Sequence, residues 1–229
     1  MKKNLTNDIP AFIFLHVNLI NQKMLIIQNI DEALVNGSQE VMEMEGGEKV
    51  GLLDVIMTRR SIRDFKKGDV PREDLKKILQ AGIMAPSPGN NQPWHFYIIE
   101  GRTKGKFVES LKSMQDPPSW QRMLVKIMEV VPDVVVVEHP MVVKLNDIWS
   151  IGSLLGTSAS IQNVLLAAHT LGYGSVWIAF PSVLEAAKKT LNIPGIVVGV
   201  LPIGHPADHQ NEYVNRARKP LEEVTTFYE

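Results

Sequence analysis

The chain has 229 residues, of which 45% are hydrophobic and 21% are charged, and its formal net charge is −1. This composition is close to that of globular proteins and excludes wholesale disorder. The near-zero charge argues against a nucleic-acid-binding protein. The sequence contains no cysteine, which excludes disulfides, thiolate nucleophiles, zinc–thiolate sites and cysteine-ligated iron–sulfur clusters.

The longest apolar run near the start of the chain, Ala11 to Ile20, is interrupted by His16 and Asn18. It falls well short of the roughly 20 apolar residues that a membrane-spanning helix needs. No small-residue cleavage site of the kind that ends a signal peptide follows it. We therefore expect a cytoplasmic protein that does not bind a membrane.

Residues 1–47 differ from the rest of the chain. Apolar residues recur at roughly helical spacing from Ile20 to Leu34, and a polar, glycine-containing stretch follows them. One interpretation is an amphipathic helix packed on the main body through a flexible joint. The other is that translation begins at Met42 or Met44, so that the extension is not native. The expected organisation is thus an extension over 1–47 and a domain over 48–229.

Four helices are predicted in the main domain. Leu53, Ile56 and Met57 mark the first, and Pro71 suits the first turn of the second, whose apolar stripe runs from Leu75 to Ile83. The third and longest covers Ser150 to Leu171, and the fourth covers Ser182 to Leu191. Apolar and small residues surround most of the long helix, which predicts burial within a core or an interface.

Short β-branched or apolar runs predict four strands, and they alternate irregularly with the helices. The strands are expected at His95 to Ile99, Val134 to Val137, Ser175 to Ile178 and Ile196 to Ile203. The last of these is apolar almost throughout and should be buried on both faces. Because the order lacks a strict βαβ rhythm, the pattern predicts an α+β fold or a mixed sheet between helices.

Two basic clusters are the first candidate binding features. The segment Arg59 to Arg63 holds three guanidinium groups and a hydroxyl within five residues, and guanidinium groups bind phosphate oxygens in a bidentate manner. The alternative is that these cations only favour a helix C-terminus. Near the end of the chain lie Arg216, Arg218 and Lys219, which alone would indicate a solvated surface.

A third feature is the polar loop between Ala85 and Trp94. Pro86, Pro88 and Gly89 restrict its shape. Hydrogen-bond donors and acceptors are supplied by Ser87, Asn90, Asn91 and Gln92. Such a loop suits a planar, hydrogen-bonding ligand. Ordinary turn chemistry is the alternative.

Taken together, these motifs resemble the nitroreductase family of FMN-dependent oxidoreductases. They occur in the family's order and spacing over about 175 residues, from about Gly51 to Phe227. The matching segments are Arg59–Arg63, Ala85–Trp94, Ile161–Gly174, Ile203–Pro206 and Arg218–Val224. Each motif alone is weak, whereas five in register are specific.

The resemblance implies an α+β, nitroreductase-like fold with a mixed, mainly antiparallel sheet flanked by helices. It also implies an intertwined homodimer with FMN at the subunit interface. The expected reaction is a ping-pong transfer of hydride from NADH or NADPH, through N5 of the flavin, to a small electron acceptor such as a nitroaromatic or a quinone. Because the cofactor carries the redox chemistry, no catalytic side chain is nominated, and no metal or nucleic acid is expected.

The resemblance also implies four groups of FMN-binding residues. Those expected at the phosphate and ribityl chain are Arg59, Arg60, Ser61 and Arg63. Those expected to reach the flavin from the other subunit are Pro86, Ser87, Pro88, Asn90 and Gln92. Those expected along the isoalloxazine ring are Trp177, Ile178 and Ala179. Those expected to close the phosphate end are Gly204, Arg216 and Arg218.

Two departures from the family pattern leave the substrate open. The extension has no counterpart in the common family core. The stretch Gly101 to Asn146, where members build substrate lids, matches no motif, and its lack of tyrosine argues against the halotyrosine dehalogenase branch. Two alternatives therefore stand: a flavin-fragmenting enzyme of the type that makes the lower ligand of vitamin B12, and a non-catalytic flavin-binding protein.

Overall fold

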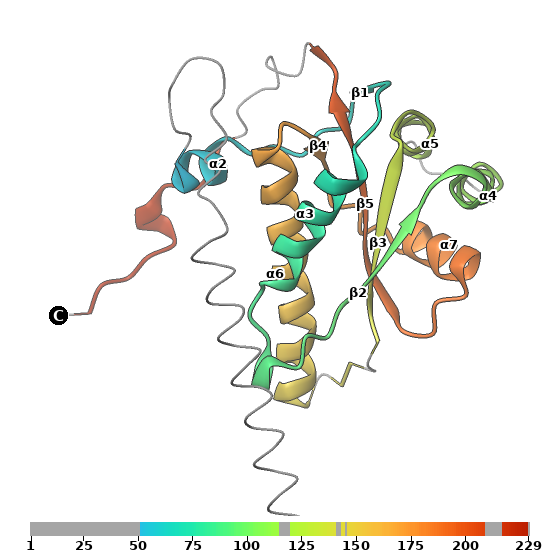
Figure 1. Ribbon diagram of the computed structural model, residues 1–229. Coiled ribbons are helices and arrows are strands. Elements are labelled where there is room, and N and C mark those ends of the chain that lie inside the picture. Colours follow the sequence, from blue (N-terminus) through green and yellow to red (C-terminus); the bar gives the residue numbers. More distant parts are fainter. Residues whose placement is uncertain (1–50, 115–119, 141–142, 145, 209–216, 229) are drawn as a thin grey trace, which may run out of the picture. The chain divides into compact units, whose positions relative to one another are not determined.

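The computed structural model describes residues 51–114, 120–140, 143–144, 146–208 and 217–228. Residues Gly51–Glu229 form one compact unit, shown in Figure 1. The helix expected between Ile20 and Leu34, and the choice between Met42 and Met44, lie outside the described residues. The boundary between extension and domain stays a prediction.

A five-stranded antiparallel sheet lies at the centre of the described part of the chain. Its strands are β1 (Phe65–Lys66), β2 (His95–Ile99), β3 (Asp133–His139), β4 (Gly174–Ser175) and β5 (Ile196–Pro206). Their order is β1-β5-β3-β2, and β4 also pairs with β5. Every pairing between these strands is antiparallel.

Helices cover both faces of the sheet. They are α2 (Leu52–Thr58), α3 (Arg72–Ile83), α4 (Gly101–Lys112), α5 (Gln121–Val130), α6 (Ile148–Thr170) and α7 (Pro181–Leu191), with single 3-10 turns η1 (Pro88–Asn90) and η3 (Leu221–Glu223). Figure 1 shows α3 and α6 on one side of the sheet and α4, α5 and α7 on the other. The predicted α+β fold is confirmed.

Strand β3 separates the two halves of the core. Val135 and Val137 point to the α3 and α6 side, whereas Val134 and Val136 belong to the cluster formed with α4, α5 and α7. All seven residues of β3 are buried. This is the pattern of a strand covered on both faces, because successive side chains point to opposite sides.

Helix α6 is the longest element, at 23 residues, and it begins where Asp147 accepts a hydrogen bond from the Trp149 N–H (3.1 Å). Among the described residues it is the one helix long and apolar enough to cross a membrane, and 44% of its most apolar window is buried inside the fold. Packing against α3 and the sheet accounts for that composition.

Three expectations differ from the structure in detail. The strand expected at Ser175 to Ile178 pairs continuously only over Gly174–Ser175 and resumes at a single bridge between Ile178 and Val200. At the interruption the register places Pro202 opposite Val176, and proline has no N–H to donate to the ladder. The loop expected at Pro86 to Gly89 contains the helical turn η1.

The stretch Gly101 to Asn146 is the third difference. The family resemblance associates it with substrate lids, but it supplies α4, α5 and the central strand β3. Phe107, Leu124 and Met128 are 0–2% exposed. The described residues of this stretch therefore belong mainly to the core.

Helix α2 is present as predicted, but its apolar side chains are not covered within the unit. Leu53, Ile56 and Met57 are exposed, and Val55 is the one buried residue of the helix. The apolar pattern that predicted this helix therefore marks a surface that needs another covering element.

The core position of α6 can be tested with Ile161→Ala. Ile161 is fully buried between the sheet and α3, so truncation should lower the free energy of unfolding by about 2–5 kcal/mol. The neighbouring exposed residue Gln162 provides the control, and Gln162→Ala should change stability little. Equal stability of both variants in urea unfolding would contradict the described packing.

Candidate functional site

The segment Arg59–Arg63 leaves α2 and is fixed to strand β4. Arg59 takes a non-helical conformation (ψ 134°) that ends the helix. The Ile62 N–H donates to the Ser175 carbonyl (2.9 Å), and a Cβ atom at Gly174 would lie 2.9 Å from Ile62 Cγ2. Glycine at that position thus lets the basic segment lie close to the sheet.

Arg59 carries a buried side-chain nitrogen. Its Nη1 has no hydrogen-bond partner among the described residues, although it is buried. Burial lowers the pKa of Arg59, and the neighbouring guanidinium groups of Arg218 and Arg60 lower it further. A desolvated cation beside two like charges is unfavourable unless an anion joins it. This cluster therefore fits an anionic ligand.

Arg60 and Arg63 donate to main-chain carbonyls instead. Arg60 Nη1 donates to the carbonyls of Met57 (2.7 Å) and Arg59 (3.0 Å), and Arg63 Nη1 donates to that of Ser61 (3.1 Å). The helix C-terminus interpretation thus describes Arg60, whose partner lies in the last turn of α2. The phosphate interpretation fits Arg59.

His169 lies beside this cluster and was not anticipated from the sequence. The Thr58 hydroxyl donates to the Asp54 carbonyl (2.6 Å), so its oxygen accepts from His169 Nε2 at 3.0 Å. Burial lowers the pKa of His169, and Arg59 and Arg60 lower it further. The sequence signal that could have indicated His169 is its position in the last turn of the long helix.

A cavity of about 300 Å³ opens next to Arg63. Its lining residues are Arg63, Met123, Leu124, Ile127, Val176, Trp177, Ile178, Ala179 and Phe180. It therefore brings together four residues that the resemblance implies, namely Arg63, Trp177, Ile178 and Ala179. The walls are mostly apolar, and they suit the flat face of a ring system.

Helix α5 supplies one wall of the cavity, which the sequence analysis missed. Met123, Leu124 and Ile127 come from this helix, and its first turn is held by Trp120, which stacks on Phe180 with ring centroids 4.2 Å apart. The signal was the amphipathic spacing of the apolar residues between Gln121 and Val130.

The loop after α3 has an unusual backbone. Asn90 (φ 54°) and Gln92 (φ 46°) join Gly89 in the left-handed region, which costs about 1–2 kcal/mol for a residue other than glycine. The Ser87 hydroxyl oxygen accepts from the Gln92 N–H (3.0 Å), and Asn91 Nδ2 donates to Ser153 Oγ (2.7 Å). These bonds hold the exposed side chains of Asn90 and Gln92 in one arrangement.

Within one chain the loop and the basic cluster lie at different parts of α6. Pro86 and Ser87 approach Gly156, where a Cβ atom would lie 3.1 Å from the Pro86 carbonyl oxygen, whereas the basic cluster adjoins His169. His169 lies thirteen positions after Gly156 on the helix, which corresponds to about 20 Å along the axis. The structure therefore does not bring these two groups together in a single chain.

The remaining predicted site residues take different positions. Gly204 is buried in β5 opposite Gly174 and does not line the cavity. Ser61 is half-buried in the basic segment, Pro88 lies in η1 against Gly152, and Arg218 is exposed. Arg216 lies outside the described residues.

Comparison with known proteins identifies the family. The model described as Nitroreductase family matches residues 56–205, which is well over half of the chain. A protein of Archaeoglobus fulgidus named "Putative NADH dehydrogenase/NAD(P)H nitroreductase" is 36% identical over 167 residues, covering 70% of this chain and 88% of that protein. The chain belongs to the nitroreductase family.

Solved structures of nitroreductase-like proteins agree with the fold. The nitroreductase-like protein from Bacillus cereus has a TM-score of 0.69 at 23% identity and covers 82% of this chain and 100% of its own. A nitroreductase-type protein from Desulfovibrio desulfuricans, solved in complex with FMN, has a TM-score of 0.60 at 25% identity and covers 78% of this chain and 96% of its own.

The environment of His169 predicts a pH dependence of stability. Because its pKa is lowered in the folded state, the unfolded chain binds this proton more tightly, and stability falls as the pH drops through the unfolded value of about 6.5. His169→Gln retains an N–H donor but does not titrate. Between about pH 7 and 5.5, ligand-free urea unfolding should show a smaller loss of stability in the variant than in the parent. An equal loss in both would contradict this role of His169.

Proposed function

We propose that the chain is an FMN-dependent oxidoreductase that uses NADH or NADPH to reduce a small acceptor, such as a nitroaromatic or a quinone, and that it acts as a homodimer. The observation that carries this proposal is the buried Arg59 nitrogen, which lacks a partner among the described residues and faces further positive charge. Membership of the nitroreductase family and the FMN complex of the Desulfovibrio desulfuricans protein support it.

The residues present fit the phosphate of FMN. A phosphate dianion at Arg59 would satisfy Nη1 and relieve the repulsion between Arg59, Arg60 and Arg218. The hydroxyl of Ser61 lies in the same segment and offers a neutral hydrogen bond. These groups would anchor one end of the cofactor and fix its orientation.

The cavity next to Arg63 fits the ring system. The α5 side chains Met123, Leu124 and Ile127 would exclude water from one face, and the segment Val176–Phe180 would lie along the other parts of the ring. Bound FMN would supply the chemistry that no side chain here provides, which is acceptance of a hydride from the nicotinamide and its donation to the acceptor. The positive charge of Arg63 at this cavity would favour an electron-rich ring.

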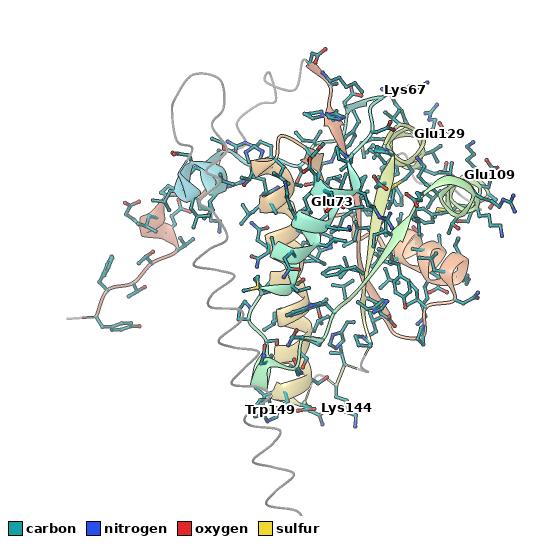
Figure 2. All side chains as sticks on the ribbon, viewed as in Figure 1. Lys67, Glu73, Glu109, Glu129, Lys144 and Trp149 are labelled. Atoms are coloured by element: carbon teal, nitrogen blue, oxygen red, sulfur yellow. The ribbon has the colours of Figure 1, made fainter. Side chains whose placement is uncertain are left out.

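A second copy of the chain completes this site. The loop carrying Asn90 and Gln92 is about 20 Å along α6 from the basic cluster of its own chain, so we assign it to the flavin of another subunit. An apolar groove lined by Pro88, Ile148, Trp149, Ile151, Gly152 and Leu155 lies beside the loop. Trp149, labelled in Figure 2, and Leu155 are 67% and 62% exposed. A two-fold partner would cover them.

The phosphate assignment predicts weaker FMN binding in Arg59→Ala and Arg218→Ala. Each variant loses a charged contact of about 1.5–3 kcal/mol, which corresponds to about a 10- to 150-fold higher Kd in a fluorescence titration. Riboflavin lacks the phosphate and is the control ligand, since parent and variants should bind it equally.

The outcomes distinguish the alternatives. Unchanged FMN affinity in both variants would contradict the phosphate assignment. Bleaching of the bound flavin by NADH or NADPH under stopped flow supports the enzyme, whereas a non-catalytic binding protein would show none. Mass spectrometry of the flavin after reduction and exposure to oxygen identifies a flavin-fragmenting enzyme, because only that enzyme would leave a cleaved isoalloxazine.

The dimer is tested with Leu155→Arg. A charge in the exposed groove should separate the subunits and lower FMN affinity with them, because an unpaired charge in an interface costs several kcal/mol. Leu165, which also lies on α6, is a less suitable position for such a charge. Its side chain is 3% exposed and packs in the chain's own core, so an arginine there would not test the interface alone. Thr103→Arg, at an exposed position of α4 on the other side of the sheet, is the control. A Leu155→Arg monomer that keeps full FMN affinity would contradict the shared site.

A further inference from the structure

A buried polar cluster joins strand β3, helix α6 and the end of the loop Pro86–Pro93. His139 is the last residue of β3 and is fully buried. Its Nδ1 lies 3.1 Å from the Pro93 carbonyl oxygen and 3.1 Å from Thr157 Oγ1. Thr157, also fully buried, donates its hydroxyl hydrogen to the same carbonyl. Two side chains from different elements thus meet at one carbonyl.

The hydrogen-bond pattern determines which ring nitrogen of His139 carries the hydrogen. The Pro93 carbonyl only accepts, and the single hydroxyl hydrogen of Thr157 is directed to this carbonyl or to that of Ser153 (3.3 Å), so Nδ1 carries the hydrogen that it donates. Nε2 then has a free lone pair, and it is buried without a hydrogen-bond partner among the described residues. A leucine of similar size would avoid that unsatisfied atom. The imidazole therefore lowers stability relative to a leucine at this position. What it contributes instead is the hydrogen bond to the Pro93 carbonyl.

The Pro93 carbonyl closes the strained loop. Gln92, directly before it, has a left-handed backbone (φ 46°), and its carbonyl accepts from the Trp94 N–H (2.9 Å). Asn91, between the two left-handed residues, is held by its bond to Ser153, one turn before Thr157 on α6. Left-handed residues other than glycine persist only where the surroundings hold them. Releasing the Pro93 carbonyl would free Asn90 and Gln92 to leave that conformation.

We propose that His139 is a positioning residue for the loop, and that with Thr157 it holds the Pro93 carbonyl so that Asn90 and Gln92 are preorganised to bind the partner subunit's flavin. The part concerning flavin rests on the proposed function. The part concerning the loop rests on the cluster itself. His139 does not touch the cofactor in this arrangement and acts only through the loop backbone.

Three variants separate positioning from stability. His139→Leu removes the donor and the unsatisfied nitrogen together. His139→Asn places an amide N–H the same number of bonds from the main chain as Nδ1, so it restores the donor while leaving an unsatisfied oxygen. Thr157→Val removes the second donor at nearly constant volume. Stability should therefore be higher in His139→Leu than in His139→Asn, whereas the order of loop positioning should be the reverse.

The first measurement is amide hydrogen exchange of the full chain without flavin. In His139→Leu and Thr157→Val, exchange at residues 90–94 should accelerate about tenfold, while amides of β3 and β5 keep their parent rates. His139→Asn should remain close to the parent in the loop. Unchanged loop exchange in His139→Leu, or equal acceleration in His139→Asn, would overturn the proposal.

The second measurement is FMN affinity of the same variants. The Kd should rise about five- to tenfold in His139→Leu and stay within about twofold of the parent in His139→Asn. The variant with the higher melting temperature, His139→Leu, should thus bind FMN more weakly. An affinity that follows melting temperature would overturn the proposal, because it indicates a purely structural role. If the parent does not bind FMN, the proposed function fails, and the exchange experiment still decides whether His139 positions the loop.

Discussion

Helix α6 carries apolar and small residues around almost its whole circumference, so other elements must pack on nearly every side of it. This requirement determines where those elements lie. Ile161 and Val164 pack against the sheet and α3. Gly152 and Gly156 are small enough for the loop after α3 to lie against the helix. At the other end, His169 bonds to Thr58 at the end of α2. The groove that includes Leu155 is left for a covering partner in the proposed dimer.

The same helix holds apart the two groups of residues to which we assign flavin binding. One is the basic cluster at its C-terminal end, and the other is the strained loop in its N-terminal half. A rigid helix keeps them about 20 Å apart, so the proposed shared flavin site follows from the length of α6 as well as from the family resemblance. In the proposed dimer, folding of the core would place both halves of the site before any cofactor binds, which would reduce the ordering cost of binding.

The sequence predicts the features of the candidate site that depend on residue composition, but not those that depend on which side chains are buried. The density of arginine between Arg59 and Arg63 is visible in the sequence, and so is the polar loop before Trp94. Arg59 has a buried nitrogen without a partner among the described residues, whereas Arg60 caps α2, and this difference depends on packing. The α5 wall of the cavity was missed because a core-facing stripe such as Leu124 and Ile127 has the same spacing whether or not a cavity lies beside it.

His139 shows a further limit of sequence patterns. It follows four valines and Glu138, which predicts only the end of a buried strand, and nothing local indicates Thr157 or the Pro93 carbonyl as partners. Buried polar groups are retained at a cost when they hold something that apolar packing cannot hold. In our proposal the cluster holds the left-handed backbone at Gln92, which apolar contacts alone would not prevent from relaxing because they are not directional. A carbonyl held by two donors from different elements is directional, and it joins the loop geometry to the core.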